Sequence, residues 1–155
     1  MKSISSVDRR GHAGFALVVA SLIAQALGLA LQEGLLFISL SATFSVLPDI
    51  DLRLELRHRR YTHNVLVALL ASALIGVTTS QAGLGFPMGF STCLLGYLCH
   101  ILGDLLTYMS FPPLWPIVKK EVSLRLFRSS DKAVNSAFMA VGSLALIAFI
   151  FKTLG

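Results

Sequence analysis

The sequence predicts an all-α fold, a polytopic transmembrane helical bundle of about five helices that forms a single integral membrane domain over residues 1–155. Composition is the first observation: 55% of the residues are hydrophobic and only 14% are charged, whereas soluble domains carry about 25% charged residues. The second is that apolar residues fall into five runs, and a spanning helix needs about 20 such residues. The third is that every Lys and Arg except Lys152 lies in one of three polar segments.

The expected helices follow the apolar runs in chain order and cover residues 13–31, 34–48, 64–79, 86–108 and 133–151. The first run lacks a clear cleavage site before Gln32, so it is expected to be a retained span. The second ends at Pro48, because proline terminates helices, and both it and the third run are short for a span. Thr62 or Asn64 is expected to cap the third helix. Prolines around Trp115 end the fourth near the membrane boundary.

The basic residues predict how the chain crosses the membrane. They lie before the first run, between the second and third, and between the fourth and fifth: Lys2, Arg9, Arg10; Arg53, Arg57, Arg59, Arg60; Lys119, Lys120, Arg125, Arg128, Lys132. Five alternating helices place these segments on one side, which the positive-inside rule makes the cytoplasm. We therefore expect a multi-pass protein of the inner (cytoplasmic) membrane with a cytoplasmic N terminus. Residues 121–127 are expected to form a short amphipathic piece on this surface.

Two other features of the composition have simple interpretations. The net charge of +5 would suggest a nucleic-acid partner in a soluble protein, but membrane topology explains these charges, so no nucleic acid is expected. Cys93 and Cys99 are six residues apart on different faces of one expected helix and should not pair with each other. Both are expected to be small packing residues, with a ligand role for Cys99 as the alternative.

Seven metal-binding types of side chain from separate regions share the predicted cytoplasmic end of the bundle: His12, Asp49, Asp51, His58, His63, His100 and Asp104. His100 and Asp104 are at i and i+4, which places them on one helix face. Ionisable groups at membrane depth are costly and usually functional, although a histidine–aspartate bond between helices is the structural alternative. Imidazole and carboxylate together favour zinc, with manganese or iron possible. Seven candidates exceed the four ligands of one structural zinc ion, so one or two divalent ions are expected.

Five motifs, in the order "GHAGF", "LPDID", "HRRYTH", "GYLCHILGDLLT" and "PPLWP", span residues 11–116. In this order they resemble the predicted membrane-bound metal-dependent hydrolases, a YdjM-like family that includes a LexA-regulated, inner-membrane-associated hydrolase of bacteria. The resemblance implies that the site comprises His12, Asp49, Asp51, His58, Arg59, His63, His100 and Asp104. Leu52 departs from the family pattern, where many relatives have histidine, and Asn135 stands near the place of a family glutamate.

Together these features lead us to expect a metal-dependent hydrolase at the cytoplasmic membrane interface, acting on a lipid phosphoester or ester. A bound metal would lower the pKa of a water molecule, and one of Asp49, Asp51 and Asp104 would be the general base. Arg59 would hold an anionic group of the substrate. The alternatives are a metal-binding sensor or transporter, and a non-catalytic structural membrane protein. A transporter should have its ligands near the bilayer midplane, whereas these residues gather at one side.

Overall fold

The computed structural model describes residues 9–50 and 61–155 and confirms the all-α architecture. Its helices are α1 (Arg9–Ala26), α2 (Leu31–Phe44), α4 (Val65–Gln81), α5 (Phe86–Leu105) and α6 (Lys132–Leu154). The described residues contain no β-strand, only two isolated bridges that join Thr107 to Phe127 and Phe111 to Val122. Residues 121–127 belong to this bridged, extended connection between α5 and α6.

The helix ends differ from the expected ends by a few residues, for local reasons. Helix α1 begins within the basic segment and ends before Gly28, whose φ of 63° is the left-handed conformation that favours glycine after a helix. Helix α2 ends at Phe44 rather than Pro48, because the chain turns from residue 45 onward. Asn64 caps α4 as expected, since its side-chain oxygen accepts a hydrogen bond from the Val67 N–H at 3.0 Å.

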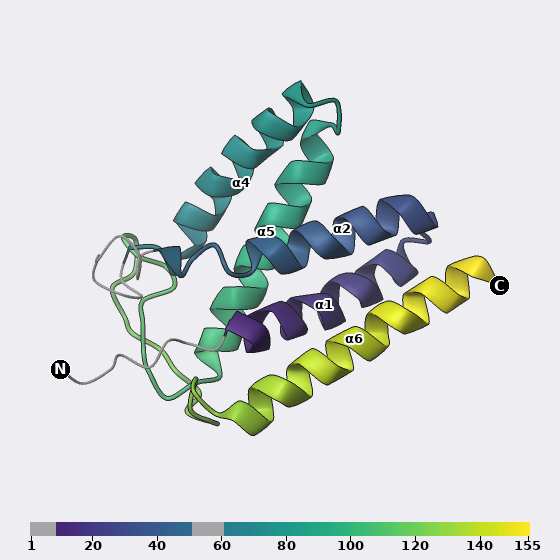
Figure 1. Ribbon diagram of the computed structural model, residues 1–155. Coiled ribbons are helices and arrows are strands. Elements are labelled where there is room, and N and C mark those ends of the chain that lie inside the picture. The colour runs from purple at the N-terminus through teal and green to yellow at the C-terminus, as the bar shows by residue number, and fades with distance from the viewer. Residues whose placement is uncertain (1–8, 51–60) are drawn as a thin grey trace.

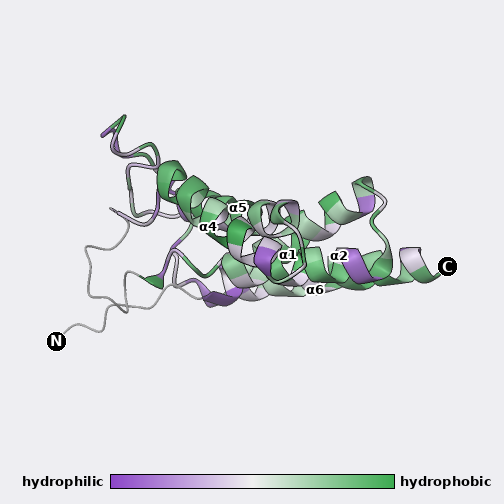
Figure 2. Ribbon diagram, turned by 90° about the horizontal axis from the view of Figure 1, so that it is seen from above, coloured by the Kyte–Doolittle hydropathy of each residue, from purple (hydrophilic) through white to green (hydrophobic). Residues whose placement is uncertain are grey.

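The helices have the surface of a membrane protein. Three segments are long and apolar enough to cross a bilayer, Leu31–Asp49, Phe86–Leu105 and Lys132–Leu154, and α4 is a shorter apolar helix. Large apolar side chains face outward; Leu74 and Leu144 are each 65% exposed and Phe151 is 72% exposed. Figure 2 shows mainly hydrophobic helices with hydrophilic residues concentrated toward their ends. The count of five crossings and the side of the N terminus stay predictions.

Two groups of helices form the bundle (Figure 1). Helix α1 lies between α2 and α6, while α4 and α5 form an antiparallel pair in which α5 crosses α1 and α2. One apolar cluster joins the first group through Ala20, Ala24, Phe37, Ile38 and Phe149. A second cluster lies around the α4–α5 pair and comprises Ala68, Tyr97, Ile101 and Phe111. The start of α1, the end of α2, the start of α4 and the end of α5 consequently gather at one end of the bundle.

Close approach of α2 and α5 depends on Gly96. A Cβ atom at this position would overlap the α2 backbone at Ser41 and Ser45, so only glycine allows the helices to come so near. Gly96 is one turn before His100, and the contact therefore brings the end of the α2 backbone against the histidine.

Candidate metal centre

His100 and Asp104 lie near the end of α5, and both side chains are fully buried. His100 Nε2 is 3.5 Å from Asp104 Oδ2, as expected for positions i and i+4 on one helix face. The other ring nitrogen, Nδ1, is 2.6 Å from the carbonyl oxygen of Ser45. A carbonyl only accepts hydrogen bonds, so Nδ1–H is the donor, and the neutral ring presents the lone pair of Nε2 to the cluster. This orientation is the one that metal-binding histidines take from their outer partners.

Asp49 reaches the same place from the turn that follows α2. Its Oδ1 atom is 3.6 Å from His100 Nε2 and 3.7 Å from His63 Nε2. The side chain is only 2% exposed, yet within the described part of the chain neither of its oxygens accepts a hydrogen bond. A buried carboxylate without hydrogen bonds is costly unless a positive charge compensates it. Asp49 therefore has the surroundings expected of a ligand for a cation.

His63 precedes α4 and is fully buried. The hydroxyl of Tyr97 donates a 2.7 Å hydrogen bond to the carbonyl of Thr62 and so ties this segment to α5. Tyr97 is thus both a packed aromatic residue and a hydrogen-bond donor. The Thr62 hydroxyl is 2.8 Å from His63 Nδ1 and can donate or accept. His63 can consequently carry its ring hydrogen on either nitrogen.

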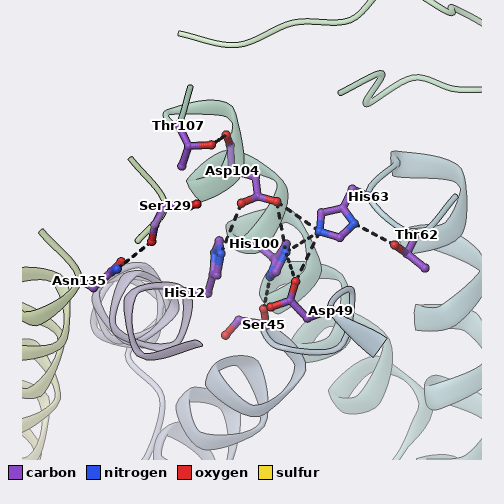
Figure 3. A network of polar contacts seen from close by, with 10 residues as sticks. All are labelled: His12, Ser45, Asp49, Thr62, His63, His100, Asp104, Thr107, Ser129 and Asn135. Atoms are coloured by element: carbon purple, nitrogen blue, oxygen red, sulfur yellow. Dashed lines mark hydrogen bonds and ion pairs between the residues drawn. The ribbon is translucent and has the colours of Figure 1, made fainter. Parts of the chain in front are cut away.

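His12, in the first turn of α1, completes the cluster in Figure 3. Its ring stacks on that of His100, with centroids 3.9 Å apart and planes at 19°. Its Nε2 is 3.5 Å from Asp104 Oδ1, whereas Asp104 Oδ2 faces His63 Nε2 at 3.2 Å. Asp104 therefore turns one oxygen toward α1 and the other toward α4.

The five side chains form two overlapping groups suited to a metal. One is Asp49, His63 and His100, the other is His12, His100 and Asp104, and the potential ligand atoms in each lie within 4.8 Å of one another. In the first group, His100 Nε2 is 2.9 Å from His63 Nε2 and 3.6 Å from Asp49 Oδ1, and His63 Nε2 is 3.7 Å from Asp49 Oδ1. Ligand atoms bound to one tetrahedral zinc ion at its usual bond lengths lie about 3.3–3.4 Å apart. The residues thus fit a divalent ion held by three protein ligands, and the second group shares His100 with the first.

The two facing imidazoles also fit a cation. Their Nε2 atoms are 2.9 Å apart, and His100 offers a lone pair there. When His63 donates Nδ1–H to Thr62, its own lone pair faces that of His100, and the pair needs a cation between them. When Thr62 donates instead, His63 carries the hydrogen on Nε2 and bonds to His100 directly. The Thr62 hydroxyl can therefore accept a hydrogen bond from His63 when a cation is bound and donate one to His63 when no cation is bound.

We expect Thr62→Val to weaken metal binding about 10–100-fold, because outer partners that orient a ligand have effects of this size. Valine has a similar shape but cannot accept the Nδ1–H of His63. Competition with a chromophoric chelator would measure the affinity, and Thr62→Ser, which keeps the hydroxyl, is the matched control. Equal affinities for Thr62→Val and the wild type would contradict this role.

Not every predicted site residue can be placed. Asp51, His58 and Arg59 lie outside the described residues, so their roles stay predictions. Cys93 and Cys99 are buried free thiols, which confirms that they do not pair with each other, and Cys99 is in neither of the described metal-type groups. Asn135 lies apart from the five-residue cluster and donates a 2.9 Å hydrogen bond to the carbonyl of Ser129. The Ser45 carbonyl was not anticipated, because a backbone acceptor has no signature in the sequence.

Comparison with known proteins identifies the family. Residues 7–154, nearly the whole chain, match the family described as YdjM inner membrane protein. No curated protein and no solved structure matches the chain. The family description places its members in the inner membrane and specifies no activity.

Proposed function

The chain belongs to the YdjM inner membrane protein family, and we propose that it is a metal-dependent hydrolase embedded in that membrane. We propose further that it acts at the cytoplasmic interface on a lipid phosphoester or ester. The observation that carries the proposal is the buried carboxylate of Asp49, which accepts no hydrogen bond among the described residues and faces two histidine nitrogens. Such a carboxylate favours a bound cation over a purely structural network.

Asp49, His63 and His100 would hold the ion, with zinc favoured and manganese or iron as alternatives. A bound divalent ion would act as a Lewis acid and lower the pKa of a water molecule toward neutrality. Three protein ligands that leave a position open are typical of catalytic zinc sites, whereas structural sites use four. Asp104 and His12 would support this group or hold a second ion with His100. Asp51 and His58 are proposed as further ligands from the motifs alone.

Proton transfer and substrate binding would be carried out by side chains of the protein. A carboxylate of the cluster would take the proton of the attacking water. Asp49 suits this role because neither of its oxygens accepts a hydrogen bond from another described residue. Asp104 is the alternative, and Asp51 is a third candidate outside the described residues. Burial of the cluster would exclude bulk water and strengthen its electrostatic effect. Arg59 is proposed to bind an anionic group of the substrate.

The position of the cluster supports a lipid substrate. The residues come from the start of α1, the turn after α2, the start of α4 and the end of α5, at one end of the bundle. Helix ends lie near the lipid headgroups, where ester and phosphoester bonds are found. A transporter would instead place its ligands near the membrane midplane with access from both sides.

Metal analysis joined to a substrate screen tests the proposal. We expect protein purified without chelators to contain about one or two divalent ions per chain, in line with the ligand count. It should hydrolyse a phosphoester or ester lipid, lose this activity on chelation and regain it when the metal returns. Full activity in metal-free protein would overturn the proposal. Metal-loaded protein that cleaves none of these lipids would favour a sensor.

A further inference from the structure

A cavity of about 300 Å³ lies beside the metal centre, between the start of α1 and the end of α2. Its lining residues are Arg9, Thr43, Phe44, Val46, Leu47, Asp49 and Ile50. It reaches the surface, because Arg9 is exposed and Ile50 is 44% exposed. Asp49, whose carboxylate faces the two histidines, is one of the lining residues, so the cavity lies next to the cluster.

Arg9 is the cation among these lining residues. It precedes His12 by three residues on α1, which places both on one side of the helix, and His12 contacts the cluster. Arg9 is therefore one turn from the site, toward the membrane surface. Thr43, the neutral polar residue of the lining, donates its hydroxyl hydrogen to the carbonyl of Ser39 at 2.8 Å. Among the described lining residues, Arg9 is thus the charged donor that could bind an anion.

The rest of the lining is mostly apolar and lies at the end of a membrane segment. Phe44, Val46, Leu47 and Ile50 supply this surface, and the apolar segment Leu31–Asp49 ends here. A soluble anion would gain nothing from these side chains, whereas an acyl chain would bury apolar area against them. The volume is at the lower end of the range for ligand pockets, about 300–1,000 Å³. It suits a headgroup with the first part of a chain rather than a whole lipid.

We propose that this cavity binds an anionic amphiphile, a lipid whose phosphate or carboxylate headgroup is held by Arg9 while its chain lies along the apolar wall. The inference rests on the proposed function, because it makes this cavity the place where the substrate's anionic group enters the metal centre. Arg9 would be a substrate-binding residue, in addition to the topological role that it shares with Arg10.

Equilibrium binding to metal-loaded protein in detergent tests the inference without turnover. The probe is a short-chain dialkyl-ether lipid with a phosphonate headgroup, which contains no ester to hydrolyse; its neutral match is the dialkyl-ether glycerol, and inorganic phosphate represents a soluble anion. Arg9→Gln should weaken binding of the phosphonate lipid about 10–100-fold, the loss expected for a charged hydrogen bond, and Arg9→Lys should restore part of it. Arg10→Gln removes the same charge from the next residue, which is not among the lining residues, and should bind like the wild type.

The apolar wall has its own test. Ile50→Ser should weaken binding of the phosphonate lipid and leave that of inorganic phosphate unchanged, because only the lipid contacts the wall. The proposal is overturned if Arg9→Gln and Arg10→Gln weaken the lipid equally, if the neutral lipid depends on Arg9 as strongly, or if inorganic phosphate binds as tightly as the lipid. If the protein hydrolyses lipid but binds the phosphonate lipid equally well without Arg9, only this inference is contradicted. If binding of the phosphonate lipid depends on Arg9 but the protein hydrolyses no lipid, the proposed hydrolase activity is contradicted and the binding site is supported.

Discussion

Replacement of His100 by alanine is expected to abolish metal binding and lipid hydrolysis together while the bundle remains folded. His100 is the member common to both metal-type groups, so its loss removes a ligand from each of them. The activity should therefore fall by more than the roughly 10–100-fold expected for a residue that only orients a ligand. Loss of its bond to the Ser45 carbonyl should lower the free energy of unfolding by about 1–3 kcal/mol, the cost of an unsatisfied buried polar group.

Metal content, turnover and thermal unfolding of the same preparation separate these effects. Leu102→Ala is the matched control, because Leu102 is on the same helix, close to His100, and is 49% exposed; it should keep both metal and activity. A His100→Ala protein that retains its metal and its turnover would place the chemistry elsewhere. If the wild type also binds no metal and the variant only loses stability, the cluster is a structural lock between helices.

The helices could be predicted from sequence because their signals are local. An apolar run and the residues at its ends, such as Gly28 or Asn64, act over a few positions, and the expected helices matched the observed ones apart from their ends. Helix α2 ends before Pro48, the terminator expected from the sequence, because the chain already turns at Ser45. Proline excludes a helix beyond it, but does not require the helix to reach it.

The membership of the cluster was partly predictable for a different reason. Charge placement assigned the helix ends to one side, so His12, Asp49, His63, His100 and Asp104 could be grouped without knowing any contact. The contacts within the group could not be predicted from the sequence, because they depend on how the helices cross. Gly96 lets α2 approach α5, and only that crossing brings the Ser45 carbonyl to His100. The cavity beside Arg9 likewise depends on the relative position of α1 and α2.

Asp49→Asn is expected to have opposite effects on stability with and without metal. With metal, the variant should be less stable than the wild type, because it has lost a charged ligand. A metal concentration of 100 times the Kd adds about 2.7 kcal/mol to the free energy of unfolding, and the variant should gain much less. After chelation the order should reverse, because the wild type then buries a carboxylate that accepts no hydrogen bond from the described part of the chain.

The reversal follows from the chemistry of the substituted side chain. Asparagine has nearly the same shape and is neutral, and its amide can donate to the lone pair of His100 Nε2, which lies 3.6 Å from Asp49 Oδ1. The metal-free variant should thus be more stable than the metal-free wild type by about 1–3 kcal/mol, the penalty removed with an unsatisfied buried group. Thermal unfolding in one detergent, with and without chelator, measures all four states.

The same four measurements distinguish a metal site from a structural network. If Asp49 serves to pair with protonated His63 and His100, its replacement by asparagine breaks buried ion pairs and costs stability in both conditions. A loss that is equal with and without chelator would therefore support the structural alternative. A change of sign requires that the carboxylate be unfavourable alone and favourable with a cation, which no helix-locking role produces. Because the comparison needs no substrate, it can be decided before the reaction itself is identified.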